Sequence, residues 1–262
     1  MPYILPETNL VSIKKESREK NQATFIIEPL SPGYGVTVGN SLRRVLISSL
    51  SGAAISSVRI DGVPHEFSTL KGMKEDVVEL LLNLKEIRFK LLSEGPVTLQ
   101  LKVSGPVKVK AGDFKSNPEV EVINCDHYLC SLDKGGSLSL EVNVEKGRGY
   151  IPVERRKEEK LPLGTIAIDS IFTPLRKVHF EVENTRVGGI TNFDKLTLDI
   201  TTDGTISPEG ALKTASQILL EHFGLVEGAI DIKPPKEKII KKAVKKVKVK
   251  KTVKAKSKKA KK

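Results

Sequence analysis

The segment Glu28–Leu50 constrains the fold of this 262-residue chain more than any other. It begins with a loop rich in Pro and Gly, residues that interrupt strands and helices. Apolar residues then recur at the i, i+3, i+4 and i+8 positions, which share one face of an α-helix. The four residues of this face are Leu42, Val45, Leu46 and Leu50. The spacing predicts an amphipathic helix over Val38–Leu50, whose apolar face must be buried against another surface.

Two adjacent arginines, Arg43 and Arg44, lie between positions of this apolar face, so at least one guanidinium points away from it. One interpretation is a helix of the chain's own core with solvated arginines. The other is a protein-docking helix, whose apolar face contacts a second copy and whose arginines pair with the carboxylates of another chain. Helical periodicity is the same in both cases, so it leaves both open.

The basic charge of the chain is concentrated at one end. The formal net charge is +12, but residues 233–262 contain 16 Lys and one Glu, which leaves 28 basic and 31 acidic residues in the rest, a net charge of −3. The Lys-rich segment has no aromatic residue, and we expect it to be disordered. It is either a solvated tail or a sequence-independent contact to DNA phosphates. The lysines predicted for such a contact are Lys241, Lys242, Lys245 and Lys246.

Short apolar or alternating stretches predict strands, several of them with one solvent-facing side. They are Phe25–Ile27, Val97–Val103, Leu138–Glu145, Val178–Val182 and Leu196–Ile200. Two more helices are predicted, one over about Lys74–Leu84 and one that begins at Ser207 and ends at Gly224. Because strands and helices do not alternate as βαβ units, the pattern favours an α+β fold over a doubly wound sheet.

No combination of residues predicts a catalytic or metal site. Cys125 and Cys130 flank His127, but a structural zinc needs four ligands and the sequence offers no second pair. The glycines between Gly33 and Gly39 lack the GK[ST] ending of a phosphate-binding loop, and we expect them to permit positive φ and close backbone approach at a packed interface. No acidic cluster that could hold two catalytic magnesium ions is visible. We therefore expect no catalytic residue, no metal and no cofactor.

The sequence also predicts a cytoplasmic location. No stretch approaches the roughly 20 apolar residues of a transmembrane helix, and the N-terminus lacks the basic-then-apolar order of a signal peptide. Two cysteines do not form a disulfide framework in a chain of this length.

Several motifs resemble the N-terminal domain of the bacterial RNA polymerase alpha subunit. They are GNSLRRVLISS at 39–49, IDGVPHEFS at 60–68, EDVVELLLNLK at 75–85, GRGYIPVE at 147–154, IDSIFTPLRKVHFEVENTRVG at 168–188 and DKLTLDITTDGTISPEGAL at 194–212. The resemblance runs in unbroken order over residues 20–228 approximately.

The resemblance implies a discontinuous arrangement. Residues 1–50 and 171–232 would form a dimerisation domain, and residues 51–170 an inserted, mostly β domain. Residues 233–262 follow as a disordered Lys-rich tail, which their composition predicts. In this family the first helix and the helix after the late strands pack against their copies in a second subunit. By motif, the candidates for this contact are Tyr34, Val38, Val45, Leu212, Ala215, Ile218 and Leu219. Each of them could instead belong to the chain's own core.

The resemblance further implies that the homodimer carries the beta and beta-prime large subunits of a DNA-dependent RNA polymerase, in which nucleotidyl transfer takes place. The candidates for contact with them are Arg43, Arg44, Lys85 and Arg148. Alpha subunits usually continue into a small helical C-terminal domain that touches promoter DNA and activators. Residues 233–262 do not resemble that domain, so the resemblance does not carry activator docking over to this chain.

Other classes of function stay open. A free-standing basic protein that binds nucleic acid would use the body as a dimeric carrier and would retain no very large partners. An autonomous enzyme would need a cleft with converging titratable groups, which the sequence does not show. Archaeal and eukaryotic alpha-like subunits are close to the leading interpretation, but LRRVLISS and GRGYIPVE favour the bacterial type.

Overall fold

The computed structural model describes residues 11–156, 162, 164–187 and 190–229. The Lys-rich segment with Lys241, Lys242, Lys245 and Lys246 lies outside the described residues. Within them, three α-helices accompany a larger number of strands, which confirms the predicted α+β class. No helix in these ranges is both long and apolar enough to cross a membrane.

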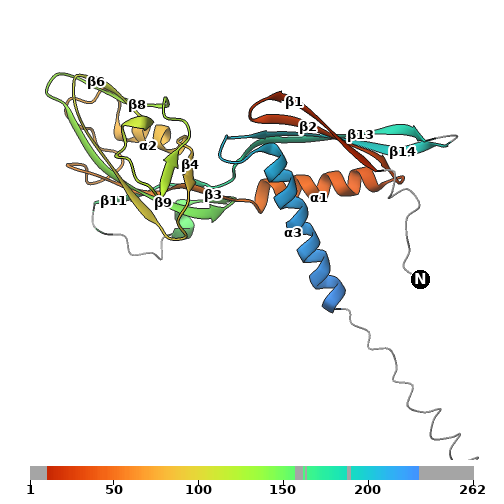
Figure 1. Ribbon diagram of the computed structural model, residues 1–262. Coiled ribbons are helices and arrows are strands. Elements are labelled where there is room, and N and C mark those ends of the chain that lie inside the picture. The colour runs from red at the N-terminus through yellow and green to blue at the C-terminus, as the bar shows by residue number, and fades with distance from the viewer. Residues whose placement is uncertain (1–10, 157–161, 163, 188–189, 230–262) are drawn as a thin grey trace, which may run out of the picture. The chain divides into compact units, whose positions relative to one another are not determined.

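One antiparallel sheet joins segments from both ends of the chain. Its strand order is β1-β2-β14-β13 (Figure 1). The strands are β1 (Ser12–Glu19), β2 (Gln22–Leu30), β13 (Leu175–Val187) and β14 (Ile190–Thr202). The central pair β2–β14 runs from Gln22 opposite Thr201 to Leu30 opposite Asp194.

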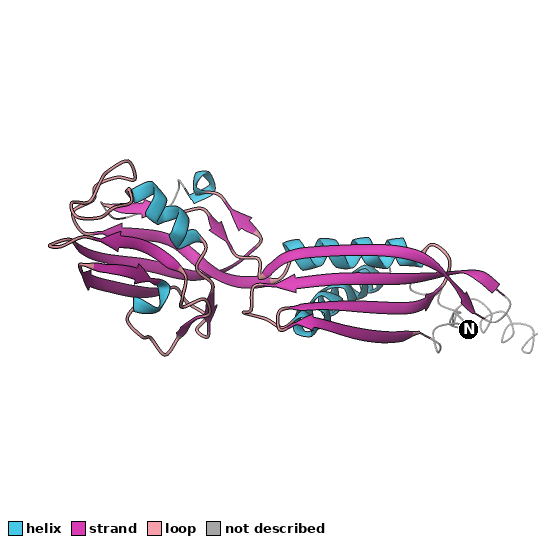
Figure 2. Ribbon diagram, turned by 90° about the horizontal axis from the view of Figure 1, so that it is seen from above, coloured by secondary structure: helices cyan, strands magenta, loops and turns pink. Residues whose placement is uncertain are grey.

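Two helices cover one face of this sheet. Figures 1 and 2 show α1 (Tyr34–Ser48) lying along the sheet, and the first part of α3 (Pro208–Ala229) packs into the same hydrophobic cluster. In this cluster Leu42 and Leu46 of α1 meet Leu198 and Ile200 of β14. The apolar face predicted for the first helix therefore lies against the chain's own sheet.

A second sheet has six strands, in the order β5-β9-β3-β4-β7 with β11 on β3. The strands are β3 (Ser51–Ile60), β4 (Phe89–Leu91), β5 (Val97–Ser104), β7 (Val120–Val122), β9 (Ser137–Arg148) and β11 (Thr165–Ala167). Alternate residues of β5 and β9 are buried, as the alternating sequence predicts. They form a separate hydrophobic cluster together with α2 (Val77–Lys85).

Short elements complete the structure. Two-stranded pairs are formed by β6 (Val107–Lys110) with β8 (Tyr128–Leu132) and by β10 (Tyr150–Ile151) with β12 (Ser170–Ile171). The 3-10 helices are η2 (Ala111–Asp113) and η3 (Val153–Arg156). Leu220 ends one compact unit, and residues 221–229 of α3 belong to a second one.

Helix boundaries differ from the sequence prediction in four places. Helix α1 ends at Ser48 rather than Leu50, since the chain leaves the helix there to enter β3 at Ser51. Helix α1 begins at Tyr34 rather than Val38, because the side chain of a distant residue caps it, as described below. Helix α2 begins at Val77 rather than Lys74, since Asp76 accepts a hydrogen bond from the Glu79 N–H and acts as the N-cap. The prediction that Gly224 ends α3 is wrong. Glycine ends a helix by adopting positive φ, and Gly224 does not adopt it.

Candidate functional site

Helix α1 rests on the β13–β14 hairpin through two glycines. A Cβ atom at Gly35 would lie 2.7 Å from Val182 Cγ1, and one at Gly39 would lie 2.7 Å from Phe180 Cδ2. Side chains do not approach each other this closely, so only glycine permits the contact. The preceding Gly33 has a φ of 85° and supplies the left-handed turn into the helix. Gly33 therefore supplies the expected positive φ, and Gly35 and Gly39 supply the expected close approach, in a contact between two elements of the same chain.

Asp194, on β14, closes the N-terminal end of α1. Its Oδ2 accepts hydrogen bonds from the backbone N–H groups of Gly33 and Gly35, each at 2.9 Å. These N–H groups have no partner within a helix, and the positive end of the helix dipole favours a carboxylate. Asp194 therefore sets where α1 begins on the sheet.

The outer face of α1 is open to solvent. Arg43 and Arg44 are both exposed, and neither forms an ion pair within the described residues. Three large apolar side chains of the same helix are also exposed, namely Tyr34 at 48%, Val36 at 56% and Ile47 at 45%. Exposed apolar groups beside arginines are typical of protein-contact surfaces.

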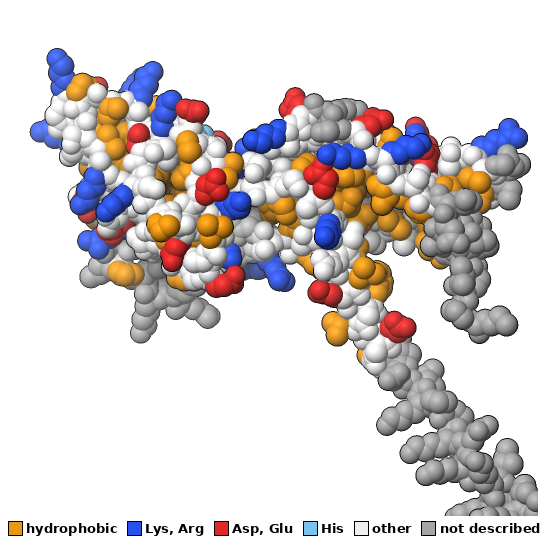
Figure 3. Space-filling view, viewed as in Figure 1, with side chains coloured by type: hydrophobic (Ala, Val, Ile, Leu, Met, Phe, Trp, Pro, Cys, Tyr) orange, Lys and Arg blue, Asp and Glu red, His pale blue; other side chains and the backbone are white. Residues whose placement is uncertain are grey.

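Helix α3 changes character along its length. Ala211 and Ala215 are fully buried in the cluster under the first sheet. From Leu220 to the end of the helix every residue is exposed. Figure 3 shows hydrophobic side chains over α1 and along this exposed part of α3. The exposed large apolar residues of α3 are Leu220, Phe223, Leu225 and Val226.

The residues predicted to contact a second copy differ in their solvent exposure. Tyr34 is exposed, and five others are partly buried; these are Val38, Val45, Leu212, Ile218 and Leu219. Ala215 is fully buried, so its side chain serves the chain's own core and has no surface left to offer. The other six keep surface that a second copy can contact.

Lys85, at the end of α2, is paired within the chain. Its Nζ lies 3.0 Å from Oδ2 of Asp169, and Asp169 Oδ1 accepts a hydrogen bond from the Val153 N–H at 2.9 Å. This hydrogen bond from Val153 is the largest cause of an Asp169 pKa below its usual value, and Lys85 and the Tyr150 hydroxyl lower it further against the effect of burial. Three motifs distant in sequence thus meet at one carboxylate.

Arg148, at the end of β9, is exposed, whereas its neighbour Gly147 faces inward. A Cβ atom at Gly147 would lie 2.6 Å from the ring of Phe172. Gly149 then turns the chain with a φ of 65°. The GRG spacing therefore presents one arginine outward while its two glycines let the backbone pass over Phe172 and turn.

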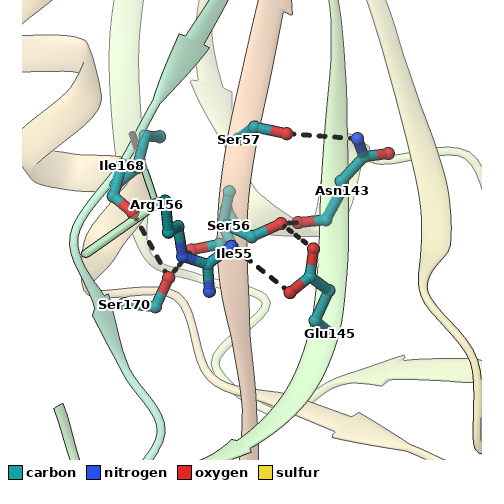
Figure 4. Close-up of polar contacts among 8 residues, drawn as sticks. All are labelled: Ile55, Ser56, Ser57, Asn143, Glu145, Arg156, Ile168 and Ser170. Atoms are coloured by element: carbon teal, nitrogen blue, oxygen red, sulfur yellow. Dashed lines mark hydrogen bonds and ion pairs between the residues drawn. The ribbon is translucent and has the colours of Figure 1, made fainter. Parts of the chain in front are cut away.

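A buried ionic cluster surrounds Arg156, and the sequence does not predict it. Arg156 Nη1 lies 3.3 Å from Glu145 Oε2, and Ser56 Oγ donates to Glu145 Oε1 at 2.6 Å (Figure 4). The guanidinium also lies 6.0 Å from the centre of the Phe172 ring. This cluster ties η3 to strands β3 and β9. No local pattern marks it, because an arginine after IPVE is indistinguishable in sequence from a solvated one.

The cysteines and His127 do not converge. Cys125 is exposed, whereas Cys130 is buried, and burial raises the pKa of the Cys130 thiol to about 12, as for a packing residue. His127 Nε2 lies 3.1 Å from the carbonyl oxygen of Asn83. Across the residues placed in the structure, no three His, Cys, Asp or Glu side chains gather closely enough to hold a metal ion.

Comparison with known proteins identifies the class. Residues 58–173 match the family described as the RNA polymerase Rpb3/RpoA insert domain. The match extends over α2, most of the second sheet and the contacts made by Lys85, Arg156 and Asp169. The chain is therefore one that carries this insert domain.

Curated relatives that match a longer part of the chain identify the family. The chain is 50% identical over 209 residues to the DNA-directed RNA polymerase subunit alpha of Clostridium kluyveri, which covers 80% of this chain and 66% of the relative. The same subunit of Clostridium botulinum is 48% identical over 211 residues, covering 80% and 67%. The chain belongs to the family of bacterial RNA polymerase alpha subunits, as the motifs predicted. The alignment spans about two thirds of the length of these relatives.

Proposed function

We propose that this chain is a non-catalytic assembly subunit of a DNA-dependent RNA polymerase in the cytoplasm. Two copies associate through α1 and α3, and the pair carries the beta and beta-prime large subunits, where nucleotidyl transfer takes place. The chain itself contributes no catalytic residue and no cofactor. The observation that carries the proposal is the exposed apolar surface of the two helices, in a chain that belongs to this family.

Several large apolar side chains of α3 are exposed to solvent in the single chain, and a second copy would bury them. Phe223 is 64% exposed, and Leu220 and Leu225 are each 71% exposed. Burial of one large apolar side chain contributes about 1.5–3 kcal/mol, so a helix with several of them exposed gains from a covering surface. In a symmetric dimer the same helix of the other copy supplies such a surface.

Contact with a large subunit is supported by exposed arginines that form no ion pair with any residue the structure describes. Arg44 is exposed, and a guanidinium can hold a carboxylate through two parallel hydrogen bonds. Arg43 and Arg148 are also exposed and offer the same chemistry. Lys85 is engaged by Asp169, so it supports this surface by positioning the end of α2.

For residues 233–262 we propose sequence-independent attraction to DNA phosphates through Lys241, Lys242, Lys245 and Lys246. Each phosphate contact releases counterions, which makes the affinity salt-dependent. Deletion of the segment should weaken DNA binding by the assembled polymerase and flatten the dependence of affinity on salt. An unchanged salt slope would exclude this role.

The assembly proposal is tested with the tagged full-length chain and a matched pair of variants. Leu220→Glu places a charge on the exposed face of α3, and Leu92→Glu places one on a leucine that is 63% exposed and lies before β5. We expect a dimer by light scattering for the wild type and Leu92→Glu, a monomer for Leu220→Glu, and recovery of two very large subunits with the wild type. A wild-type chain that stays monomeric at micromolar concentration contradicts dimerisation. A dimer that retains no large partner supports the basic carrier instead.

A further inference from the structure

A short segment after β9 is held to the rest of the chain mainly by side chains. We call residues 149–156 the strap, which contains β10 and η3. Strand β10 pairs with β12 through its two residues. Pro152 has no backbone N–H to continue a strand, and the pairing ends at Ile151. Beyond Ile151, the strap depends on contacts made at the two ends of η3.

The first contact holds the beginning of η3. Asp169 Oδ1 accepts a hydrogen bond from the Val153 N–H at 2.9 Å, and Lys85 Nζ lies 3.0 Å from Asp169 Oδ2. The Asp169 carboxylate also accepts a hydrogen bond from the Tyr150 hydroxyl. The Lys85 and Asp169 side chains are only 27% and 31% exposed, so solvent screens this pair less than a surface pair. One carboxylate therefore joins the strap to the end of α2.

The second contact holds the end of η3. Arg156 Nη1 lies 3.3 Å from Glu145 Oε2, and the other oxygen of Glu145 accepts a hydrogen bond from the Ser56 hydroxyl at 2.6 Å (Figure 4). The Arg156 guanidinium also lies 6.0 Å from the centre of the Phe172 ring. Arg156 is 9% exposed, and a buried cation is costly without its carboxylate. This contact joins the strap to β3 and β9.

Only η3 separates the two contacts. Val153 is its first residue and Arg156 its last. A 3-10 helix of four residues is too short to be stable without tertiary contacts. Displacement of either end therefore moves the other end away from its partner, and we expect both contacts to be lost together.

We propose that the strap is a conformational latch that opens as one unit. Asp169 closes it at one end and Glu145 closes it at the other. Opening exposes the guanidinium of Arg156, which the closed strap keeps buried, and makes it available to acidic groups. The latch is a property of the chain itself and does not depend on the assembly function.

Hydrogen exchange resolved to single amides tests the coupling in the full-length chain. The reporter is the Arg155 N–H, which donates to the Pro152 carbonyl oxygen at 3.1 Å and contacts neither carboxylate. We expect it to exchange about tenfold faster in Asp169→Ala and in Lys85→Met, as for loss of a charge-assisted hydrogen bond. The matched control is Glu154→Gln, at an exposed residue of η3, which should exchange as the wild type does.

The reverse experiment changes the other end. In Arg156→Met the Val153 N–H should exchange about tenfold faster, although its acceptor Asp169 is intact. The double variant Asp169→Ala/Arg156→Met should exchange no faster at Arg155 than the more affected single variant. If Arg156→Met does not fold, Lys85→Met still tests the coupling, because Lys85 is partly exposed. Trypsin cleavage after Arg155, located by mass spectrometry, should rise by a similar factor in Lys85→Met.

Three outcomes would overturn the latch. The first is wild-type exchange of the Arg155 N–H in Asp169→Ala, which would show that each contact acts on its own end alone. The second is multiplication of the two single effects in the double variant, which would make the contacts independent. The third is equal acceleration at Arg155 and at Leu101 in β5, because the strap would then open only when the surrounding sheet unfolds.

Discussion

Asp194 Oδ2 lies 2.9 Å from the backbone nitrogen of Gly35, so a carboxylate of strand β14 holds the first turn of helix α1. The two residues are 159 positions apart in sequence. The helix that carries Arg43 and Arg44 is therefore placed by a residue near the other end of the folded chain. Two predictions concern this arrangement.

Replacement of Asp194 should loosen the start of α1. In Asp194→Ala the N–H groups of Gly33 and Gly35 lose their acceptor, and we expect the free energy of unfolding to fall by about 1–3 kcal/mol. Asp194→Asn keeps an acceptor oxygen without the charge and should lose about 0.3–1 kcal/mol. Urea unfolding at one fixed protein concentration measures both, because dimerisation also contributes to stability. Equal values for all three proteins would show that the cap is unimportant.

Substitution of Gly39 should be unfavourable although it lies in a helix. Alanine has the higher helix propensity by about 1 kcal/mol, but its Cβ would meet Phe180 and Leu196 at 2.7 and 2.9 Å. We expect Gly39→Ala to lower the free energy of unfolding by about 1–3 kcal/mol through overpacking. The control is Gly224→Ala in α3, where an added Cβ atom would have no described atom within 4 Å apart from its chain neighbours and the backbone of its own helix. It should be neutral or stabilising, and a similar loss in both variants would refute the packing explanation.

The Asp169 contacts predict acid sensitivity. Because the folded-state pKa of Asp169 lies below the usual value of an aspartate, its contribution to stability is present above the unfolded-state pKa. It is lost as the pH falls through the folded-state pKa. Unfolding followed between about pH 5 and about pH 2 should therefore show a shallower loss of stability for Asp169→Asn than for the wild type. Parallel pH profiles would indicate that the charge of Asp169 does not contribute to the pH dependence of stability.

Arg44 is predicted to affect assembly and not folding. Its side chain is exposed and has no ion pair within the described part of the chain, so Arg44→Ala should leave a folded dimer with unchanged melting temperature. We expect about tenfold lower recovery of the large subunits, as for loss of a bidentate pair. Lys134→Ala, at an exposed turn, is the control. Normal co-purification of the large subunits with Arg44→Ala at moderate salt would remove Arg44 from the contact.

Regular elements were predicted well from the sequence where their periodicity was strong. All five predicted strands lie within the longer strands β2, β5, β9, β13 and β14, and the apolar face of the first helix is the buried one. Strand β1 was not predicted, because SIKKESRE is mostly polar and β1 is an edge strand that pairs with β2 alone. An edge strand with few buried residues leaves little pattern in the sequence.

The functional surfaces were only partly predictable. The family motifs predict contacts at Arg43, Arg44 and Arg148, and all three are exposed in the structure. The motifs also predict a contact at Lys85, which forms an ion pair with Asp169.

The sequence by itself determined the family, the α+β class, the positions of the three helices and of five strands, and the separation of charge between the body and the Lys-rich segment. These properties depend on residue spacing and composition, which can be read from a short segment of the chain without knowing what it packs against. Only the tertiary structure decided which surface covers each apolar face, that Asp194 caps α1, and that Arg156 is buried while Arg44 is exposed. These outcomes depend on strand pairing between residues far apart, such as Leu30 with Asp194, and periodicity shows that a face must be buried without showing what buries it.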